Sequence, residues 1–68
     1  MIKVNLLEAR MKEKNVWYPE LCEYLDMLYQ SLNKRLNGKV EFRLGEVNKI
    51  RKFLNLSKEQ ADEIFYFE

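Results

Sequence analysis

The segment YQSLNKRLNGK, residues 29–39, has the pattern of a short helix that packs on one side only. Leu32 and Leu36 lie four residues apart, which puts both on one face of a helix and predicts that this face is buried. Gly38 follows at the place where a helix commonly ends in the left-handed conformation. We therefore predict a helix over residues 29–37. Its opposite face is expected to expose Tyr29, Gln30, Asn33, Lys34 and Asn37.

The polar side chains on that exposed face suit recognition of DNA bases. Amides such as those of Gln30 and Asn33 can form paired hydrogen bonds with adenine, and Lys34 can reach guanine acceptors or phosphate. A polar helix face followed by glycine also occurs on small domains that bind no nucleic acid. The segment by itself therefore leaves two interpretations open, a recognition helix and a solvated surface.

The composition indicates one small folded domain over residues 1–68. The chain is 47% hydrophobic and 34% charged, which is too apolar for a disordered chain and too polar for a membrane protein. No apolar run approaches the roughly 20 residues needed to cross a bilayer, and charges interrupt the N-terminal segment, unlike a signal peptide. We expect a cytoplasmic protein.

The residue inventory argues against catalysis. The chain has one cysteine and no histidine, so neither an internal disulfide nor a His/Cys metal cluster can form. We expect Cys22 to be a small buried residue. The carboxylates of Glu20, Glu23 and Asp26 are expected on a surface rather than in a pocket. We predict no enzyme activity, no cofactor and no metal.

Positive charge is concentrated directly after the candidate recognition helix. The net charge is only +1, but residues 34–52 hold seven basic residues against two acidic ones. A basic face at this place would attract phosphates, with strong salt dependence. A solvated helical surface is the alternative.

The remaining apolar residues recur at three- and four-residue steps and predict an all-α fold of five short helices. Asn5 with Glu8 suggests a capping box for the first helix, and Ser57 with Gln60 suggests another for the fifth. The left-handed region suits Asp26 in the turn after the second helix. Val40 and Phe42 are expected to tuck against the core, as is Leu44. Besides residues 29–37, the predicted helices cover residues 6–14, 19–25, 44–54 and 57–65.

The order of these elements resembles the Cro and lambda-repressor-like helix-turn-helix family, in particular its short phage-type repressors. The resemblance covers roughly residues 4 to 66. It rests on Glu20, Leu21 and Leu25 in the second helix, on Gln30, Leu32, Lys34, Leu36 and Asn37-Gly38-Lys39 around the third, on Phe42, Leu44, Glu46 and Ile50, and on the closing LNLSKEQADEIF.

The resemblance implies a transcriptional repressor of phage or mobile-element origin that binds duplex DNA as a homodimer, with the third helix in the major groove. Carried over by position, the base-contacting residues are Tyr29, Gln30, Asn33 and Lys34. The phosphate-contacting residues are Tyr18, Asn37, Lys39 and Arg43. The dimer interface is expected at Phe65, Tyr66 and Phe67, because an aromatic cluster of this kind near a chain end suits a two-fold contact.

Four positions depart from the family pattern. Trp17 and Tyr18 replace the usual Thr-Gln pair at the start of the second helix, Asp26 replaces a glycine in the turn, and Leu28 replaces a Ser or Thr cap. Trp17 and nearby tyrosines suit a protein partner if exposed together. We expect Trp17 to pack against the first helix and the core instead, with the tyrosines at its rim. The alternative function is a helix-turn-helix scaffold used for protein–protein binding, as an antirepressor or an inhibitor of a host defence system.

Overall fold

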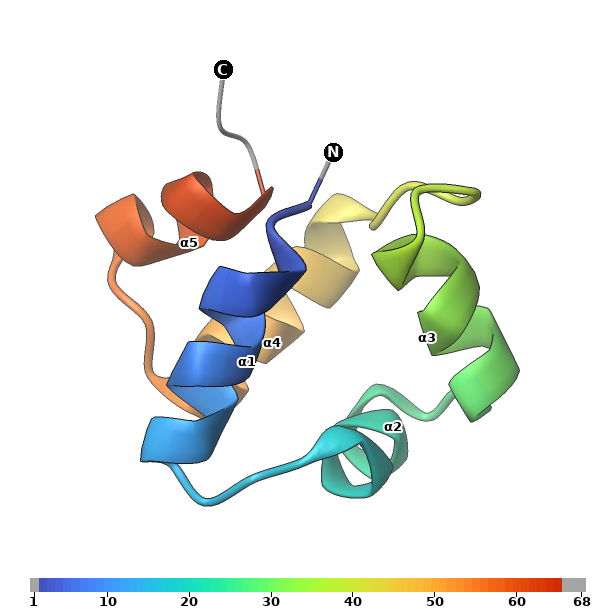
Figure 1. The fold of residues 1–68 in the computed structure, drawn as a ribbon, viewed down its shortest axis with the longest axis horizontal. Coiled ribbons are helices and arrows are strands. Elements are labelled where there is room, and N and C mark those ends of the chain that lie inside the picture. Colours follow the sequence, from blue (N-terminus) through green and yellow to red (C-terminus); the bar gives the residue numbers. More distant parts are fainter. Residues whose placement is uncertain (1, 66–68) are drawn as a thin grey trace.

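The computed structural model describes residues 2–65, and this part of the chain forms five α-helices and no strand (Figure 1). The helices are α1 (Val4–Glu13), α2 (Tyr18–Leu25), α3 (Tyr29–Leu36), α4 (Leu44–Leu54) and α5 (Lys58–Phe65). The predicted all-α class with five helices is confirmed. None of these helices combines the length and apolar character needed to cross a bilayer.

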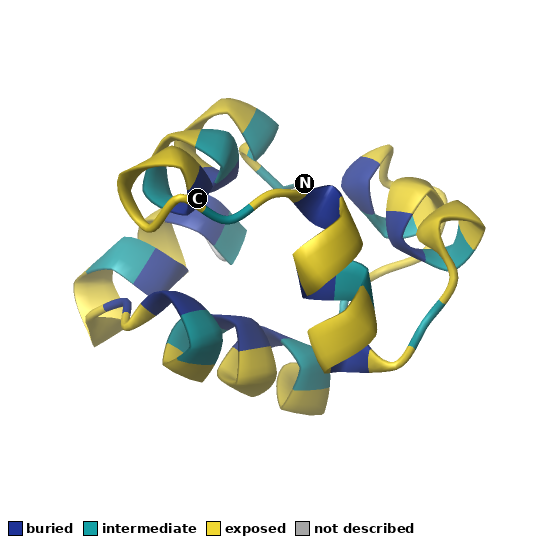
Figure 2. Cartoon of the chain, turned by 90° about the horizontal axis from the view of Figure 1, so that it is seen from below, coloured by how far each residue is buried: buried dark blue, intermediate teal, exposed yellow. Residues whose placement is uncertain are grey.

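The helices surround one hydrophobic core. α1 packs beside α5, α2 contacts both α3 and α4, and α4 also contacts α5. Buried positions on the helices turn toward the centre, and exposed ones face outward (Figure 2). The largest side chains with almost no exposure are Leu7, Met11, Leu21, Leu32, Ile50, Leu54 and Ile64.

The first helix begins earlier than its sequence suggested. α1 starts at Val4 after Lys3, and no side chain caps it, so the predicted Asn5–Glu8 capping box is wrong. The reason is a tertiary contact: the Lys3 N–H donates to the carbonyl oxygen of Ile64 in α5, at 2.9 Å. That bond fixes the backbone before Asn5 and outweighs the local preference for a polar cap.

Side chains three residues into α2, α4 and α5 stabilise the starts of these helices. Glu20 Oε1 accepts from the Trp17 N–H at 2.8 Å, and Glu46 Oε1 accepts from the Arg43 N–H at 3.0 Å. Ser57 and Gln60 exchange two hydrogen bonds, of 2.9 and 3.1 Å, which confirms the capping box predicted there. α3 follows Leu28 and has no side-chain cap.

Four helices end in the same way, in a Schellman motif. A left-handed residue follows each helix: Asn15, Asp26, Gly38 and Asn55, with φ of 57°, 56°, 81° and 54°. The next N–H in the chain then donates back to a helix carbonyl, at 2.9–3.1 Å in each case. After three of these turns an apolar residue, Val16, Met27 or Leu56, returns to the core. After Gly38 comes the exposed Lys39.

Three expectations about the core are wrong. Leu44 is 66% exposed, although its spacing from Val47 suggested burial, because α4 begins at Leu44 and reaches the core only at Val47, which is 3% exposed. Val40 is 40% exposed, whereas Phe42 does pack against the core. Cys22 is only partly buried, and the burial it has raises the pKa of its thiol.

The two glycines predict opposite changes in stability. Gly38→Ala places a side chain in the left-handed region and is expected to lower the free energy of unfolding by about 1 kcal/mol. Gly45 lies in α4, and the Cβ added by Gly45→Ala would have no packing neighbour within 4 Å. This substitution is expected to raise the free energy of unfolding by about 0.5–1 kcal/mol. Urea unfolding of both variants checks this pair. Equal shifts in the same direction would contradict the backbone geometry of the two positions.

Candidate nucleic-acid interface

The polar face of α3 is exposed as predicted. Tyr29 is 53% exposed, and Gln30, Asn33, Lys34 and Asn37 are also exposed, all on the side away from the core. Leu32 is fully buried and Leu36 nearly so. The predicted base-contacting side chains therefore share one outward surface, which we call the α3 face.

An ion pair between α3 and α4 fixes the rotation of that face. Arg35 Nε donates to Glu46 Oε1 at 2.9 Å, and Arg35 Nη1 donates to the carbonyl oxygen of Ser31 at 2.9 Å. Both charged side chains are largely shielded, with 14% and 18% of their surfaces exposed. Burial alone would raise the pKa of Glu46, but the hydrogen bonds and charges of Arg35 and Arg43 leave that pKa lowered.

Two arginines make hydrogen bonds within the molecule, which reduces the number of cations available to bind phosphate. Arg35 is committed to Glu46, and Arg51 Nε donates to the carbonyl oxygen of Leu56 at 3.3 Å. Lys34, Lys39 and Arg43 stay exposed on α3 and on the segment after it. We call these three residues the basic rim; Lys34 also belongs to the α3 face, and Lys39 and Arg43 follow that face in the chain. Lys49 and Lys52 are exposed on α4.

Tyr18 is not placed for the phosphate contact expected of it. Its side chain is 8% exposed and belongs to the core, and its hydroxyl donates to Glu8 Oε2 at 2.6 Å. Burial first, and then the hydrogen bond and negative charge of Glu8, raise the pKa of Tyr18. The hydroxyl therefore joins α1 to α2 inside the molecule and is not available to a ligand.

Trp17, in contrast to Tyr18, lies on the surface. It is 47% exposed rather than packed against the first helix and core, and Leu28, before α3, is 71% exposed. The Trp17 ring lies 4.7 Å from that of Tyr18, which in turn lies 6.0 Å from the ring of Tyr29. The sequence showed these aromatics close together along the chain but not which of them the core would accept. Trp17 and Leu28 are thus surface residues that the sequence-based prediction missed.

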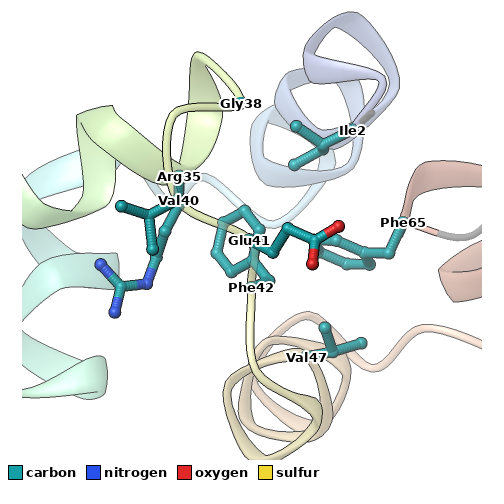
Figure 3. Close-up of a pocket in the computed structure, with 8 residues that line it drawn as sticks. All are labelled: Ile2, Arg35, Gly38, Val40, Glu41, Phe42, Val47 and Phe65. Carbon is teal, nitrogen blue, oxygen red and sulfur yellow. The ribbon is translucent and has the colours of Figure 1, made fainter.

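The predicted dimer residues are only partly within the described chain. Phe65 is half-buried, with its ring edge-on to Phe42 at 5.2 Å between ring centres, and Tyr66 and Phe67 lie outside the described residues. A pocket of about 340 Å³ adjoins this aromatic pair, and the Arg35 guanidinium at its border points away from Phe65 (Figure 3). Its lining residues are Ile2, Arg35, Gly38, Val40, Glu41, Phe42, Val47 and Phe65.

The chain matches no protein-family model, no curated protein and no solved structure. The surfaces that the described residues offer to a ligand include the α3 face, the basic rim, and the exposed indole of Trp17 before α2.

The contact between Arg35 and Glu46 predicts a pH-dependent stability. Because the pKa of Glu46 is lowered in the folded protein, its contribution is complete above the ordinary carboxyl value of 4.5 and is lost as the pH falls through the lowered value. Glu46→Gln is expected to cost about 1–2 kcal/mol at pH 7, between the values typical of exposed and buried pairs. The deficit relative to the unmodified protein should shrink toward pH 3.

Urea unfolding at pH 7 and at pH 3 measures this difference. Glu13→Gln is the matched control, because Glu13 pairs with Arg10 at 3.2 Å in an exposed position, with 59% of its side chain in solvent. That substitution should change the free energy of unfolding by less than about 0.5 kcal/mol at either pH. A Glu46→Gln deficit of the same size at both pH values would contradict the proposed role of the charge.

Proposed function

We propose that this protein is a sequence-specific regulator of transcription that binds duplex DNA. In this proposal α2 and α3 form a helix-turn-helix and α3 is the recognition helix. The observation that carries the proposal is the α3 face: Gln30, Asn33 and Lys34 are exposed together on a helix held by buried leucines and an ion pair. Lys39 and Arg43 of the basic rim follow it in the chain.

The dimensions of α3 suit the major groove. An α-helix with its side chains has a diameter of about 10–12 Å, close to the roughly 12 Å width of the major groove, and the 8 residues of α3 extend about 12 Å along the helix axis. Amide side chains presented from such a helix can bond adenine, and Lys34 can bond guanine. Tyr29 can contact bases from the first turn of the same helix.

Phosphate contacts in this proposal come from the C-terminal side of α3 rather than from α2. Asn37, Lys39 and Arg43 are exposed there and carry donors. At the start of α2, the Trp17 N–H is already bonded to Glu20, and an exposed carboxylate lies at Asp26 after the same helix. Negative charge repels the DNA backbone, so α2 contributes less to binding than the second helix of the family does.

We extend the proposal to a homodimer that acts as a repressor of phage or mobile-element origin. Two copies related by a two-fold axis read two half-sites of a pseudo-palindromic operator. The aromatic residues Phe65, Tyr66 and Phe67 are the proposed contact. The partly exposed surface around Phe42 and Phe65 supports this assignment, because it adjoins an open pocket.

A second candidate function is favoured by Trp17 and Leu28. Their exposure on the α2 side is typical of a protein-binding surface, because tryptophan and other large apolar side chains anchor interfaces. A helix-turn-helix scaffold used as an antirepressor or as an inhibitor of a host defence system would have such a surface.

Salt dependence tests DNA binding without knowledge of the operator. If the two phosphate-contacting cations, Lys39 and Arg43, each neutralise one phosphate, the slope of log K against log salt is about −1.8 per chain. Affinity for generic duplex should then fall about 12-fold between 50 and 200 mM salt. A fluorescence anisotropy titration with labelled duplex measures it. Absence of binding at the lower salt concentration would refute the proposal and favour a protein partner.

Two substitutions separate base reading from phosphate binding. Gln30→Ala should relax sequence preference, by about 1–3 kcal/mol of discrimination at one position, when bound duplexes are selected from a random library. Lys39→Ala should weaken all sequences similarly and reduce the salt slope by about 1. Lys58→Ala, an exposed lysine on α5, is the control and should change neither quantity. Identical effects of the first two substitutions would show that these roles are misassigned.

A further inference from the structure

An aromatic groove lies at the junction of α2 and α3, with a volume of about 370 Å³. Its lining residues are Trp17, Tyr18, Pro19, Cys22 and Tyr29. The buried ring of Tyr18 lies between two half-exposed rings, at 4.7 Å from Trp17 and 6.0 Å from Tyr29. An apolar hollow flanked by exposed aromatic rings has the composition of an interface core.

Trp17 is also open on its second side. Another hollow, of about 290 Å³, separates it from α1 and is lined by Asn5, Glu8, Ala9, Lys12 and Trp17. The indole thus projects from the fold with nearly half of its surface in water, where it adds little to the core. Exposed tryptophans that border a hollow commonly anchor a protein partner.

The segment that carries the groove is acidic, and Lys12 on α1 lines the second hollow beside Trp17. Between Asn15 and Asn33 the chain has three carboxylates, Glu20, Glu23 and Asp26, and no lysine or arginine. The two ion pairs found among residues 2–65 involve none of these three side chains. An adjoining hollow of about 380 Å³ continues the apolar surface to Leu28, and is lined by Cys22, Glu23, Asp26, Met27 and Leu28.

We propose that the aromatic groove docks a segment of a partner protein that carries lysine or arginine beside an apolar anchor. The anchor fills the hollow between Trp17 and Tyr29, and the basic side chains face Glu23 and Asp26. A cation over the indole adds a cation–π contact. The same carboxylates repel the phosphate backbone, so the charge of this surface favours a basic peptide over a nucleic acid.

The groove and the α3 face share Tyr29. A segment seated in the groove would cover this residue and the start of α3, and so prevent DNA from reaching the neighbouring Gln30. Docking and DNA binding are then mutually exclusive, and the partner acts as an inhibitor of DNA binding. This last consequence rests on the proposed function, whereas docking itself does not.

Trp17 is the only tryptophan in the chain, so its fluorescence reports directly on the groove. The probe is a tryptophan-free peptide of about 14 residues, four helical turns, with lysine and leucine in amphipathic order. A second peptide of the same length replaces every lysine with glutamate. The lysine peptide should shift the Trp17 emission saturably, and the glutamate peptide should not.

Variants are compared by anisotropy of the same peptide carrying fluorescein. Trp17→Ala should weaken binding by about tenfold or more, as expected for an anchor residue. The double variant Glu23→Lys, Asp26→Lys should also weaken it, and more strongly at low salt. Leu44→Ala is the control, because Leu44 is 66% exposed on α4 and lines none of these hollows. It should leave the affinity within about twofold, since an exposed residue outside the contact adds little.

Two results would overturn the docking proposal: equal affinity of Trp17→Ala and the unmodified protein for the lysine peptide, or a Trp17 response to duplex DNA and none to the peptide. Competition between the peptide and labelled duplex tests exclusion, measured against the peptide and duplex alone because the cationic peptide itself binds DNA. Simultaneous binding of both would overturn the inhibitory role. A protein that binds the peptide but never binds duplex would overturn the proposed DNA function alone and support docking.

Discussion

The ion pair between Arg35 and Glu46 is the contact on which the arrangement of α3 depends. One carboxylate oxygen accepts from the Arg35 guanidinium on α3 and from the Arg43 N–H that precedes α4. The same group therefore stabilises the start of one helix and fixes the rotation of another. Leu32 and Leu36 determine which side of α3 is buried, and the ion pair adds a bond to α4 that favours the same orientation. The outward direction of Gln30 and Asn33 results from both constraints.

Local sequence signals were sufficient for most of the helical architecture. The spacing of Leu32 and Leu36 predicted the buried side of α3, and Ser57 with Gln60 predicted the start of α5. Contacts between distant residues were not predictable in this way. The Lys3–Ile64 hydrogen bond moved the start of α1, and Arg35 reaches a partner eleven residues away. Each of these depends on how helices pack, which the spacing of apolar residues along the chain does not specify.

In the candidate site, too, local spacing predicted some features, whereas tertiary packing determined others. Exposure of the α3 face was predicted, because its polar residues occupy helix positions opposite the two buried leucines. The burial of Tyr18 and the exposure of Trp17 were not predicted, because two adjacent aromatic residues give no periodic signal that shows which one faces the core. Tyr18 enters the core because Glu8, ten residues earlier, accepts its hydroxyl, whereas the indole of Trp17 has no comparable place. As a result, the exposed indole of Trp17 and the ring of Tyr29 on the α3 face line the same groove.

The four Schellman turns differ in the residues that come after the left-handed position. After Asn15, Asp26 and Asn55 the chain returns an apolar side chain to the core, so these corners hold the register between neighbouring helices. After Gly38 it runs through exposed residues until Phe42. Substitutions between these two points change exposed side chains and remove none from the core. The composition of this segment can therefore vary with little effect on folding.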